Sequence, residues 1–188
     1  MNTVLKSPLF DTAAYLVWEE NQTEKHEYIA GEVFAMAGAR RAHVVVAGNI
    51  FAALKQALRG SSCQTYISDM KLRVEQMDAF YYPDVMVSCS AQDNKAEQYL
   101  SEPTLIAEVL SESTAAFDRG NKFAAYRTLA TLQEYVIIDI SARSVECYCR
   151  TPENDWLLHD YRGDDACTFT SVGVTVPMVE LFENVVMS

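Results

Sequence analysis

The chain has 188 residues, of which 49% are hydrophobic and 22% are charged, with a formal net charge of −11. This length fits a single domain, residues 1–188, that buries a core of its own. No apolar run is long enough to cross a bilayer, and Met1–Pro8 lacks the basic and apolar regions of a signal peptide. We therefore expect a cytoplasmic protein without membrane contact. Its acidity argues against indiscriminate binding to nucleic acid.

The charge is unevenly distributed along the chain. Residues 40–73 hold six basic residues and one acid, whereas residues 151–188 hold seven acids and one arginine. This distribution is compatible with a basic face on an acidic body.

Cysteines occur at five positions: Cys63, Cys89, Cys147, Cys149 and Cys167. The number is odd, and the spacing matches no zinc-binding motif. We expect reduced thiols that pack as small apolar side chains.

Periodicity and turn residues predict the elements of the N-terminal half. A short helix is expected at Asp11–Glu20, opened by a capping aspartate. Two β-rich runs within Lys25–Ala37 meet at Ala30-Gly31 and predict a hairpin. Helical spacing continues over Arg40–Arg59, and Gly60 is a suitable C-cap. The strands expected next are Cys63–Tyr66, Lys71–Glu75 and Phe80–Ser88.

The C-terminal half alternates strands with one helix. Ser90–Ser101 is polar and aperiodic, which predicts a loop with a turn of helix at most. The apolar runs Thr104–Leu110 and Glu134–Ile140 predict buried strands on either side of a helix at Asp118–Ala130. This order indicates a right-handed crossover between parallel strands. The last predicted elements are edge strands at Ser144–Arg150 and Trp156–Tyr161, a strand at Val174–Val176 and a short helix at Val179–Phe182.

These elements predict one mixed α/β (α+β) domain. A central mixed β-sheet is flanked by helices, and a helix and hairpin precede it at the N-terminus.

Two predicted core strands each carry a carboxylate that packing does not require. Asp84 directly follows Tyr82-Pro83, and Glu108 lies 24 residues later in Ile106–Leu110. Burying ionised carboxylates is costly, and two on neighbouring strands repel each other, unless a cation or partner compensates them. Oxygen-only ligands favour Mg²⁺ or Mn²⁺. Because such an ion polarises phosphodiesters and activates water, the pair predicts a metal-dependent phosphodiesterase.

A basic residue stands close to the pair in sequence. Lys122, in the first turn of the predicted helix, is suited to orient or deprotonate the attacking water and to stabilise developing charge. Simpler explanations remain open. Glu108 and Lys122 also fit a buried ion pair, and Asp118 fits an N-cap or an i,i+4 pair with Lys122. Asp84 also fits an acid at a strand end.

Pro83-Asp84 followed by Glu108 is similar to the motif of the PD-(D/E)XK nuclease superfamily. The lysine expected two residues after the acid is replaced by Leu110. The chain resembles more closely the Uma-type family of restriction endonucleases, which belongs to that superfamily. The segments that carry this resemblance, in family order, are Tyr28–Glu32, Tyr82–Val85, Ala107–Thr114, Asp118–Lys122 and Glu134–Asp139.

The resemblance implies a restriction-endonuclease-like core, Mg²⁺ or Mn²⁺ as cofactor and DNA as substrate. It implies that the catalytic lysine is displaced onto the helix, at Lys122. It adds a third acid at Glu32, with Glu27 as the second choice, and a helix histidine at His43. The family often has Glu before this lysine, where the chain has Asn121. Because related nucleases that cut both strands usually act as dimers, a homodimer is also implied.

The leading hypothesis is thus a metal-dependent DNA endonuclease with Asp84 and Glu108 as metal ligands. The expected phosphate contacts are Arg40, Arg41, Lys71, Arg73 and Arg119. The alternative is a catalytically silent domain of the same fold that binds nucleic acid or self-associates, which the acidic charge and Leu110 favour. Hydrolysis of another phosphoester would use the same residues. Surface roles for Glu27, Glu32 and His43 also remain open.

Overall fold

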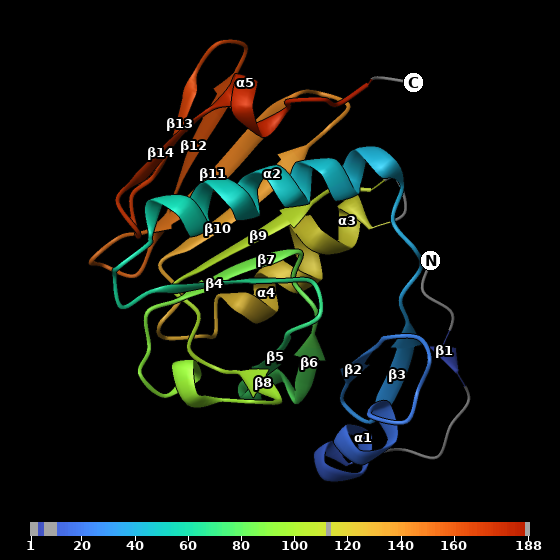
Figure 1. Cartoon of the computed structure of the whole chain (residues 1–188). Coiled ribbons are helices and arrows are strands. Elements are labelled where there is room, and N and C mark those ends of the chain that lie inside the picture. Colours follow the sequence, from blue (N-terminus) through green and yellow to red (C-terminus); the bar gives the residue numbers. More distant parts are fainter. Residues whose placement is uncertain (1–3, 6–10, 112–113, 187–188) are drawn as a thin grey trace.

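The computed structural model describes residues 4–5, 11–111 and 114–186 (Figure 1). The predicted absence of a signal peptide concerns Met1–Pro8, most of which lies outside these residues, as do Glu112 and Ser113 of the segment Ala107–Thr114. In the described part of the chain, no helix is both long and apolar enough to span a membrane.

A six-stranded mixed sheet forms the centre of the molecule, as the sequence predicts. Its strand order is β12-β11-β10-β9-β7-β4. Strands β9 and β10 are parallel, which confirms the predicted crossover partners, and the other neighbours are antiparallel. The strands are β4 (Gln64–Ile67), β7 (Val85–Ser88), β9 (Leu105–Val109), β10 (Glu134–Asp139), β11 (Ser144–Arg150) and β12 (Trp156–Arg162).

A second six-stranded sheet joins the N-terminal hairpin to the centre of the chain. Its order is β1-β3-β2-β6-β5-β8. The strands are β1 (Val4–Leu5), β2 (His26–Ile29), β3 (Glu32–Ala35), β5 (Lys71–Val74), β6 (Ala79–Tyr81) and β8 (Tyr99–Leu100). A separate hairpin near the C-terminus pairs β13 (Ala166–Phe169) with β14 (Val174–Pro177). Strands β1, β8 and β13 were not predicted from the sequence; β8 lies in Ser90–Ser101, where a loop was expected.

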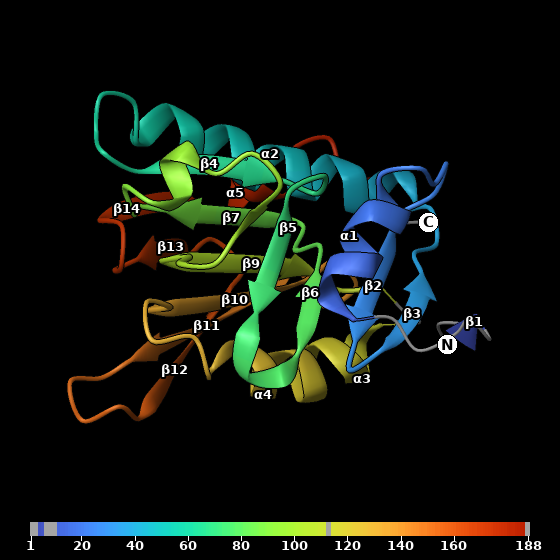
Figure 2. The same ribbon diagram turned by 90° about the horizontal axis from the view of Figure 1, so that it is seen from below.

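Helices cover both faces of the central sheet, as Figure 2 shows from below. The long helix α2 lies along one face, and the helical segment around α3 and α4 covers the other (Figures 1 and 2). The helical elements are α1 (Thr12–Glu19), α2 (Arg41–Ala57), 3₁₀ turns at Glu75–Met77 and Asp93–Lys95, α3 (Ala115–Phe117), a π-helical turn at Asp118–Lys122, α4 (Phe123–Tyr126) and α5 (Met178–Leu181).

The predicted local signals at the N-terminus are confirmed. Asp11 caps α1 by accepting a hydrogen bond from Ala14 N at 2.7 Å. The hairpin turns at Ala30 and Gly31, whose φ angles of 48° and 92° lie in the left-handed region. Glycine reaches that region without the steric cost of a Cβ atom, which explains its place in this tight turn.

Two predicted boundaries are wrong. The expected strand Phe80–Ser88 is divided between β6 and β7, which belong to different sheets. Pro83 lies at the break, where its missing N–H cannot join a strand ladder. The expected helix Asp118–Ala130 begins instead at Ala115 and contains a π-helical turn. The described helix ends at Tyr126.

Alternating side chains divide the core between the two faces of the central sheet. Val85 and Ala107 pack with α2 residues such as Ile50 in one cluster. Met86 and Ile106 point to the opposite face and pack in a second cluster with Tyr126, Tyr135 and Leu72. The second cluster therefore lies between the sheet, the α4 segment and strand β5.

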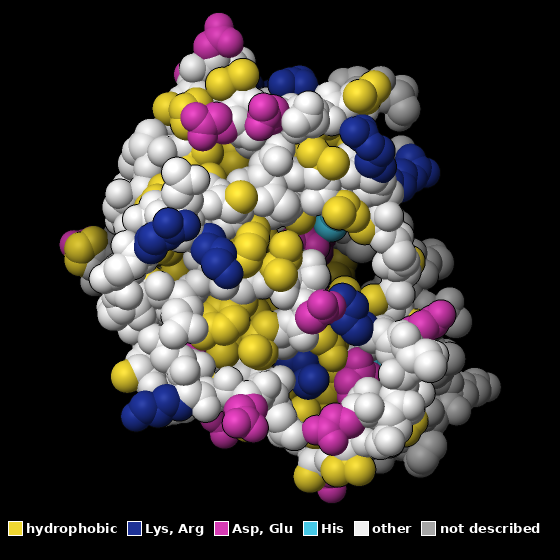
Figure 3. Space-filling view, in the orientation of Figure 1, with side chains coloured by type: hydrophobic (Ala, Val, Ile, Leu, Met, Phe, Trp, Pro, Cys, Tyr) yellow, Lys and Arg dark blue, Asp and Glu magenta, His cyan; other side chains and the backbone are white. Residues whose placement is uncertain are grey.

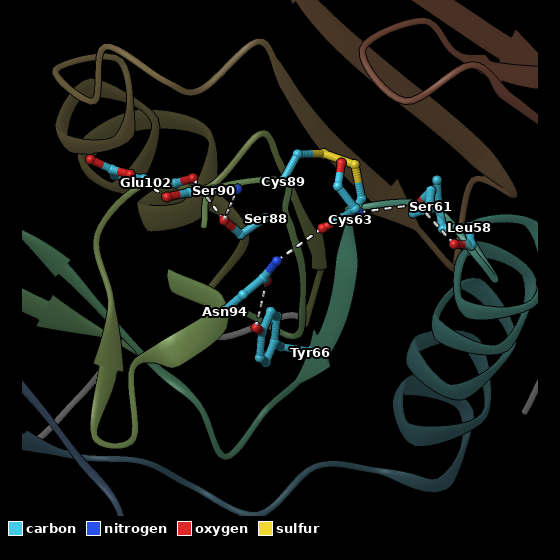
Figure 4. The surroundings of a disulfide bond; sticks show 10 residues. Leu58, Ser61, Cys63, Tyr66, Ser88, Cys89, Ser90, Asn94 and Glu102 are labelled. Carbon is cyan, nitrogen blue, oxygen red and sulfur yellow. Dashed lines mark hydrogen bonds between the residues drawn. A yellow bond between two sulfur atoms is a disulfide. The ribbon is translucent and has the colours of Figure 1, made fainter. Parts of the chain in front are cut away.

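The expectation that all five thiols are reduced is wrong. Cys63 and Cys89 form a disulfide (Figure 4). Strands β4 and β7 pair with Gln64 opposite Ser88, so the next residues outward, Cys63 and Cys89, face each other across the ladder. The bond thus depends on strand register rather than on sequence spacing. Cys147, Cys149 and Cys167 are free, as predicted.

Candidate active site

Asp84 and Glu108 meet across adjacent strands of the central sheet. β7 and β9 are antiparallel with Val85 opposite Ala107, so Asp84 stands opposite Glu108 one position further along. Directly opposed residues point to the same face with Cβ atoms about 5 Å apart. The two carboxylates that the sequence singled out therefore converge at one end of this strand pair.

Each carboxylate is also anchored to the neighbouring backbone. Asp84 Oδ2 accepts a hydrogen bond from Val109 N at 2.8 Å. In return, Asp84 N donates to Glu108 Oε2 at 3.3 Å. Glu108 is buried, whereas the Asp84 side chain keeps 17% of its surface accessible. Asp84 thus forms the open side of the pair and Glu108 the enclosed side.

The helical segment brings Lys122 to Glu108. The Lys122 Nζ atom lies 3.2 Å from Glu108 Oε1, 3.1 Å from Glu27 Oε1 and 3.6 Å from Asp118 Oδ1. Leu110, at the position where the superfamily motif has its lysine, packs in the second hydrophobic cluster. The structure therefore places Lys122 where a displaced lysine would reach the acidic pair.

The third acid in contact with this group is Glu27 and not Glu32. Glu27 is buried beside Lys122, whereas Glu32 is exposed. In the β2–β3 register Glu32 stands opposite Ile29, at the hairpin turn. That position is two residues, or about 7 Å, further along the strand than Glu27. The choice of Glu32 is therefore corrected to Glu27, because the register carries Glu32 away from Lys122.

His43, the predicted helix histidine, contacts Asp84. Its Nε2 atom lies 3.2 Å from Asp84 Oδ2, and its side chain is 18% exposed. Burial alone would lower the pKa of His43, but the hydrogen bond and charge of Asp84 outweigh it and raise this pKa. The first turn of α2 thus sets a basic group against the open side of the acidic pair.

Tyrosines surround the enclosed side. The Tyr126 hydroxyl donates to Glu108 Oε1 at 2.9 Å, and the Tyr135 hydroxyl donates to the Asp118 backbone oxygen at 3.0 Å. Burial and the nearby Glu108 charge raise the pKa of both phenols well above the usual value. Both phenols therefore remain protonated hydrogen-bond donors.

Burial also controls the charge state of the acids. It raises the pKa of Glu108 to about 8, although Lys122 acts in the opposite direction. Asp118 behaves similarly, with a pKa raised by burial and lowered in part by Lys122. For Lys122 itself, burial lowers the pKa but the carboxylates raise it well above the usual value. Lys122 is therefore a fixed positive charge and is not suited to deprotonate water.

The donor set fits a divalent cation. Four carboxylates (Glu27, Asp84, Glu108 and Asp118) face the single charge of Lys122 and the His43 ring. Among the described residues, no three His, Cys, Asp or Glu side chains already form a metal site. Mg²⁺ needs only one or two protein carboxylates, because waters and substrate phosphates complete its shell. Asp84 and Glu108 would be those two ligands.

The five candidate phosphate contacts fall into two groups. Arg119 makes two hydrogen bonds to Glu146, and Arg73 is paired with Asp78 at 2.9 Å. Their charges are already compensated. Arg40 and Arg41 are exposed at the start of α2, near His43, and Lys71 lies 5.6 Å from the centre of the Tyr82 ring.

Lys25 was not among the predicted contacts, yet it approaches the same tyrosine. Its Nζ atom lies 5.7 Å from the centre of the Tyr82 ring and pairs with Asp69. Tyr82 is two residues before Asp84.

Figure 3 shows a hollow below the start of α2, with acidic and histidine side chains in its wall and basic side chains above and below it.

Three residues of the site have sequence signals that are weak on their own. Tyr126 stands four residues after Lys122, the spacing that places two side chains on one helix face. Asp118 stands four residues before Lys122, a spacing that also fits an ordinary ion pair on a helix surface. Glu27 is an acid in a β-rich run. None of these patterns reveals that the side chains share one buried centre.

The fold and the site define a restriction-endonuclease-like protein. A mixed sheet brings two carboxylates together at the end of adjacent strands, and a lysine from a following helix contacts one of them, Glu108. A crystal structure described as a "putative nuclease belonging to DUF820" from Anabaena variabilis ATCC 29413 is similar to this chain, with a TM-score of 0.77 and 14% identity. The similarity covers 94% of this chain and 99% of that one, and it shows the shared fold.

Sequence comparison identifies the family. The model of Uma2, described as "Putative restriction endonuclease", matches residues 12–177, so the chain belongs to this family. Two proteins of Synechocystis sp. (strain ATCC 27184 / PCC 6803 / Kazusa) are similar over 168 residues. The protein named slr1290 is 34% identical, covering 89% of this chain and 88% of its own length. The protein named sll1609 is 36% identical, covering 88% and 95%.

Proposed function

We propose that this protein is an endonuclease that hydrolyses phosphodiester bonds of DNA with the help of Mg²⁺ or Mn²⁺. The observation that carries the proposal is the cross-strand pair of Asp84 and Glu108, with Lys122 3.2 Å from Glu108. Membership of a family with nuclease-like proteins supports the same reaction class.

The residues of the site would have different roles in the reaction. Asp84 and Glu108 would hold the cation, which supplies Lewis-acid polarisation of the phosphodiester and lowers the pKa of water. Lys122 keeps its charge and stabilises negative charge that develops beside Glu108. His43 keeps Asp84 oriented, and Glu27 and Asp118 hold the Lys122 ammonium in place. A substrate would enter from the Asp84 side, because that side is accessible.

The basic side chains near the opening favour a nucleic-acid substrate. Arg40 and Arg41 lie at the start of the helix that carries His43. Lys71 lies beside Tyr82. Positive groups on both sides of an acidic centre would bind consecutive phosphates of a DNA strand, while the remaining acidic surface limits indiscriminate binding.

Incubation of the purified protein with plasmid DNA and Mn²⁺ tests the proposal. We expect nicking or linearisation by the wild type and at least a 100-fold slower reaction for Glu108→Gln, about the cost of losing one charge-stabilising group. Glu32→Gln is the matched control, because it removes an exposed acid of the same chain and should cut normally. Equal cleavage by wild type and Glu108→Gln would show that the activity belongs to a contaminant.

We also propose that the protein acts as a homodimer. Strand β12 is one of the two outer strands of the central sheet, and its Leu157 and Leu158 are 53% and 47% exposed. Exposed edge strands of this kind pair readily with another chain. Light scattering should give the mass of two chains, and Leu158→Lys should shift it toward one. A wild-type mass of one chain contradicts the proposal.

A cytoplasmic location, where DNA is accessible, belongs to the same proposal. The Cys63–Cys89 disulfide is more typical of oxidising compartments. Thiol trapping in intact cells distinguishes a reducing from an oxidising compartment. Rapid alkylation of Cys63 and Cys89 supports the cytoplasmic location, and protection of both contradicts it.

The alternative is a catalytically silent domain of the same fold that binds nucleic acid or self-associates. The ring of carboxylates around Lys122 favours it, because a fully compensated lysine offers little charge to a substrate. Binding of DNA without cleavage in Mg²⁺ or Mn²⁺, by wild type and Glu108→Gln alike, would support this alternative.

A further inference from the structure

We propose that Tyr126 is a positioning residue for Glu108 and determines which carboxylate oxygen faces the reaction centre. This proposal rests on the proposed function, because the orientation matters for the cation that Asp84 and Glu108 would share. It concerns a side chain that lies in the core and was not among the residues predicted from the sequence.

The two oxygens of Glu108 have different partners. Oε1 accepts hydrogen bonds from the Tyr126 hydroxyl at 2.9 Å and from Lys122 Nζ at 3.2 Å. Within the described part of the chain, Oε2 accepts only a longer hydrogen bond of 3.3 Å, from Asp84 N. Two strong donors therefore hold Oε1 on the side away from Asp84, and Oε2 points toward Asp84.

Tyr126 is itself held rigidly. The side chain is fully buried. Its ring packs edge-on against Tyr81, with centroids 5.4 Å apart, and against Tyr135, with centroids 5.5 Å apart. Edge-to-face pairs of this kind stabilise one ring orientation. The hydroxyl position is therefore defined by the hydrophobic core and not by a flexible loop.

Lys122 alone would not define the orientation as well. Its ammonium also contacts Glu27 and Asp118, and an ammonium on a flexible stem has three donors that can rotate among acceptors. The planar Tyr126 ring has one donor in one place. Without it, the terminal torsion of Glu108, which is intrinsically broad, is free to turn the carboxylate away from Asp84.

The test is Tyr126→Phe in the full-length protein, which removes one oxygen and keeps the ring packing. We expect Mn²⁺ binding, measured by calorimetry, to weaken about 10–100-fold, as on removal of other groups that orient metal ligands. The kcat for DNA cleavage should fall while KM for DNA stays unchanged, because the phosphate contacts lie elsewhere.

Tyr28→Phe is the matched control. The Tyr28 hydroxyl also donates to a carboxylate, Asp78 Oδ2, at 2.8 Å, but outside the site. It should leave Mn²⁺ affinity and kcat unchanged. If Tyr126→Phe lowers only the thermal stability and leaves Mn²⁺ affinity and kcat at wild-type values, Tyr126 is merely structural and the proposal is overturned.

A crystal structure of Tyr126→Phe separates this proposal from the proposed function. If the wild type neither binds Mn²⁺ nor cuts DNA, the proposed function fails. The positioning role is then decided by the Glu108 side chain alone. A rotated or multiply oriented carboxylate in the variant supports the role, and an unchanged carboxylate overturns it.

Discussion

Asp84 and Glu108 are joined by reciprocal contacts, in which Asp84 N donates to Glu108 Oε2 and Asp84 Oδ2 accepts from Val109 N. Each acid is therefore oriented by the backbone beside the other. Backbone groups of a central sheet move little, so the relative positions of the two carboxylates are preorganised. The contrast between the accessible Asp84 and the enclosed Glu108 gives the site one direction of approach.

Replacing Lys122 should strongly destabilise the fold. Lys122→Met leaves Glu27, Glu108 and Asp118 buried without their counter-charge, and breaking a buried ion pair in this way costs about 3–5 kcal/mol. Urea denaturation at neutral pH measures the loss. Lys55→Met, on the last turn of α2, serves as the control and should change stability little. A loss similar to that of the control would contradict a central role for the Lys122 charge.

Stability without divalent cations should fall as pH rises. Burial raises the pKa of Glu108 to about 8 from an ordinary value of 4.5. Because the pKa is higher in the folded state, the protonated Glu108 stabilises the fold. This stabilisation is complete at pH values below the unfolded-state pKa of 4.5 and is lost as pH rises through the folded-state pKa of about 8. Unfolding free energies in EDTA should therefore decline from about pH 4.5 to about pH 8 and level off above it. Glu108→Gln should show a flatter profile; identical slopes would contradict the prediction.

Asp78→Asn should loosen the N-terminal hairpin. Asp78 accepts hydrogen bonds from Thr12, Tyr28 and Arg73, and its side chain is 48% exposed. Solvent screening limits the expected loss to about 1 kcal/mol.

The Asp78 effect should depend on pH with the opposite sign. Burial alone would raise the pKa of Asp78, but its three partners lower it below the usual value. The stabilisation is therefore present above the unfolded pKa of 3.8 and lost as pH falls through the lower folded value. Wild type and Asp78→Asn should become equally stable in acid, as measured by urea denaturation. A difference that persists there would indicate loss of packing instead.

Reduction of the disulfide should weaken the edge of the central sheet. Cys63 and Cys89 close a loop with a sequence separation of 26, and a cross-link over such a loop contributes roughly 2–4 kcal/mol. Cys63→Ser should lower the melting temperature, and adding a reductant to this variant should lower it no further, because the bond is already absent. Cys149→Ser, a free cysteine, is the control. Thiol titration of the unreduced, denatured wild type should find three free cysteines; five would contradict the bond.

Arg41→Gln should weaken DNA binding through charge alone. Arg41 is exposed at the start of α2, whereas Lys55 lies in its last turn, about 21 Å away along the helix. Loss of one phosphate contact reduces the slope of log K against log salt concentration by about one. Fluorescence anisotropy at several salt concentrations measures this slope. Lys55→Gln should bind as the wild type does, and equal effects of both changes would indicate non-specific attraction.

Much of the architecture follows from local sequence. The apolar runs identify β9 and β10, and the period of α2 is clear because it packs one face on the sheet. Asp84 and Glu108 stand out locally because each interrupts an apolar strand. The predicted strand boundaries are wrong where tertiary structure overrides local preference. Residues of β6 and β7 form one apolar run in the sequence, but the chain breaks at Pro83 and the two strands join different sheets.

The sequence by itself determined most strands of the central sheet, the long helix and two of the acids, because these depend on residue alternation and on polarity within a few positions. Only the tertiary structure decided that Glu27 and not Glu32 reaches Lys122, because β2 is positioned by its pairing with β6, Tyr28 opposite Phe80. It also decided the Cys63–Cys89 bond and the contact of Tyr126 with Glu108. The residues in these contacts are far apart in sequence, so no local interaction favours their meeting. Strand register and helix packing bring them together.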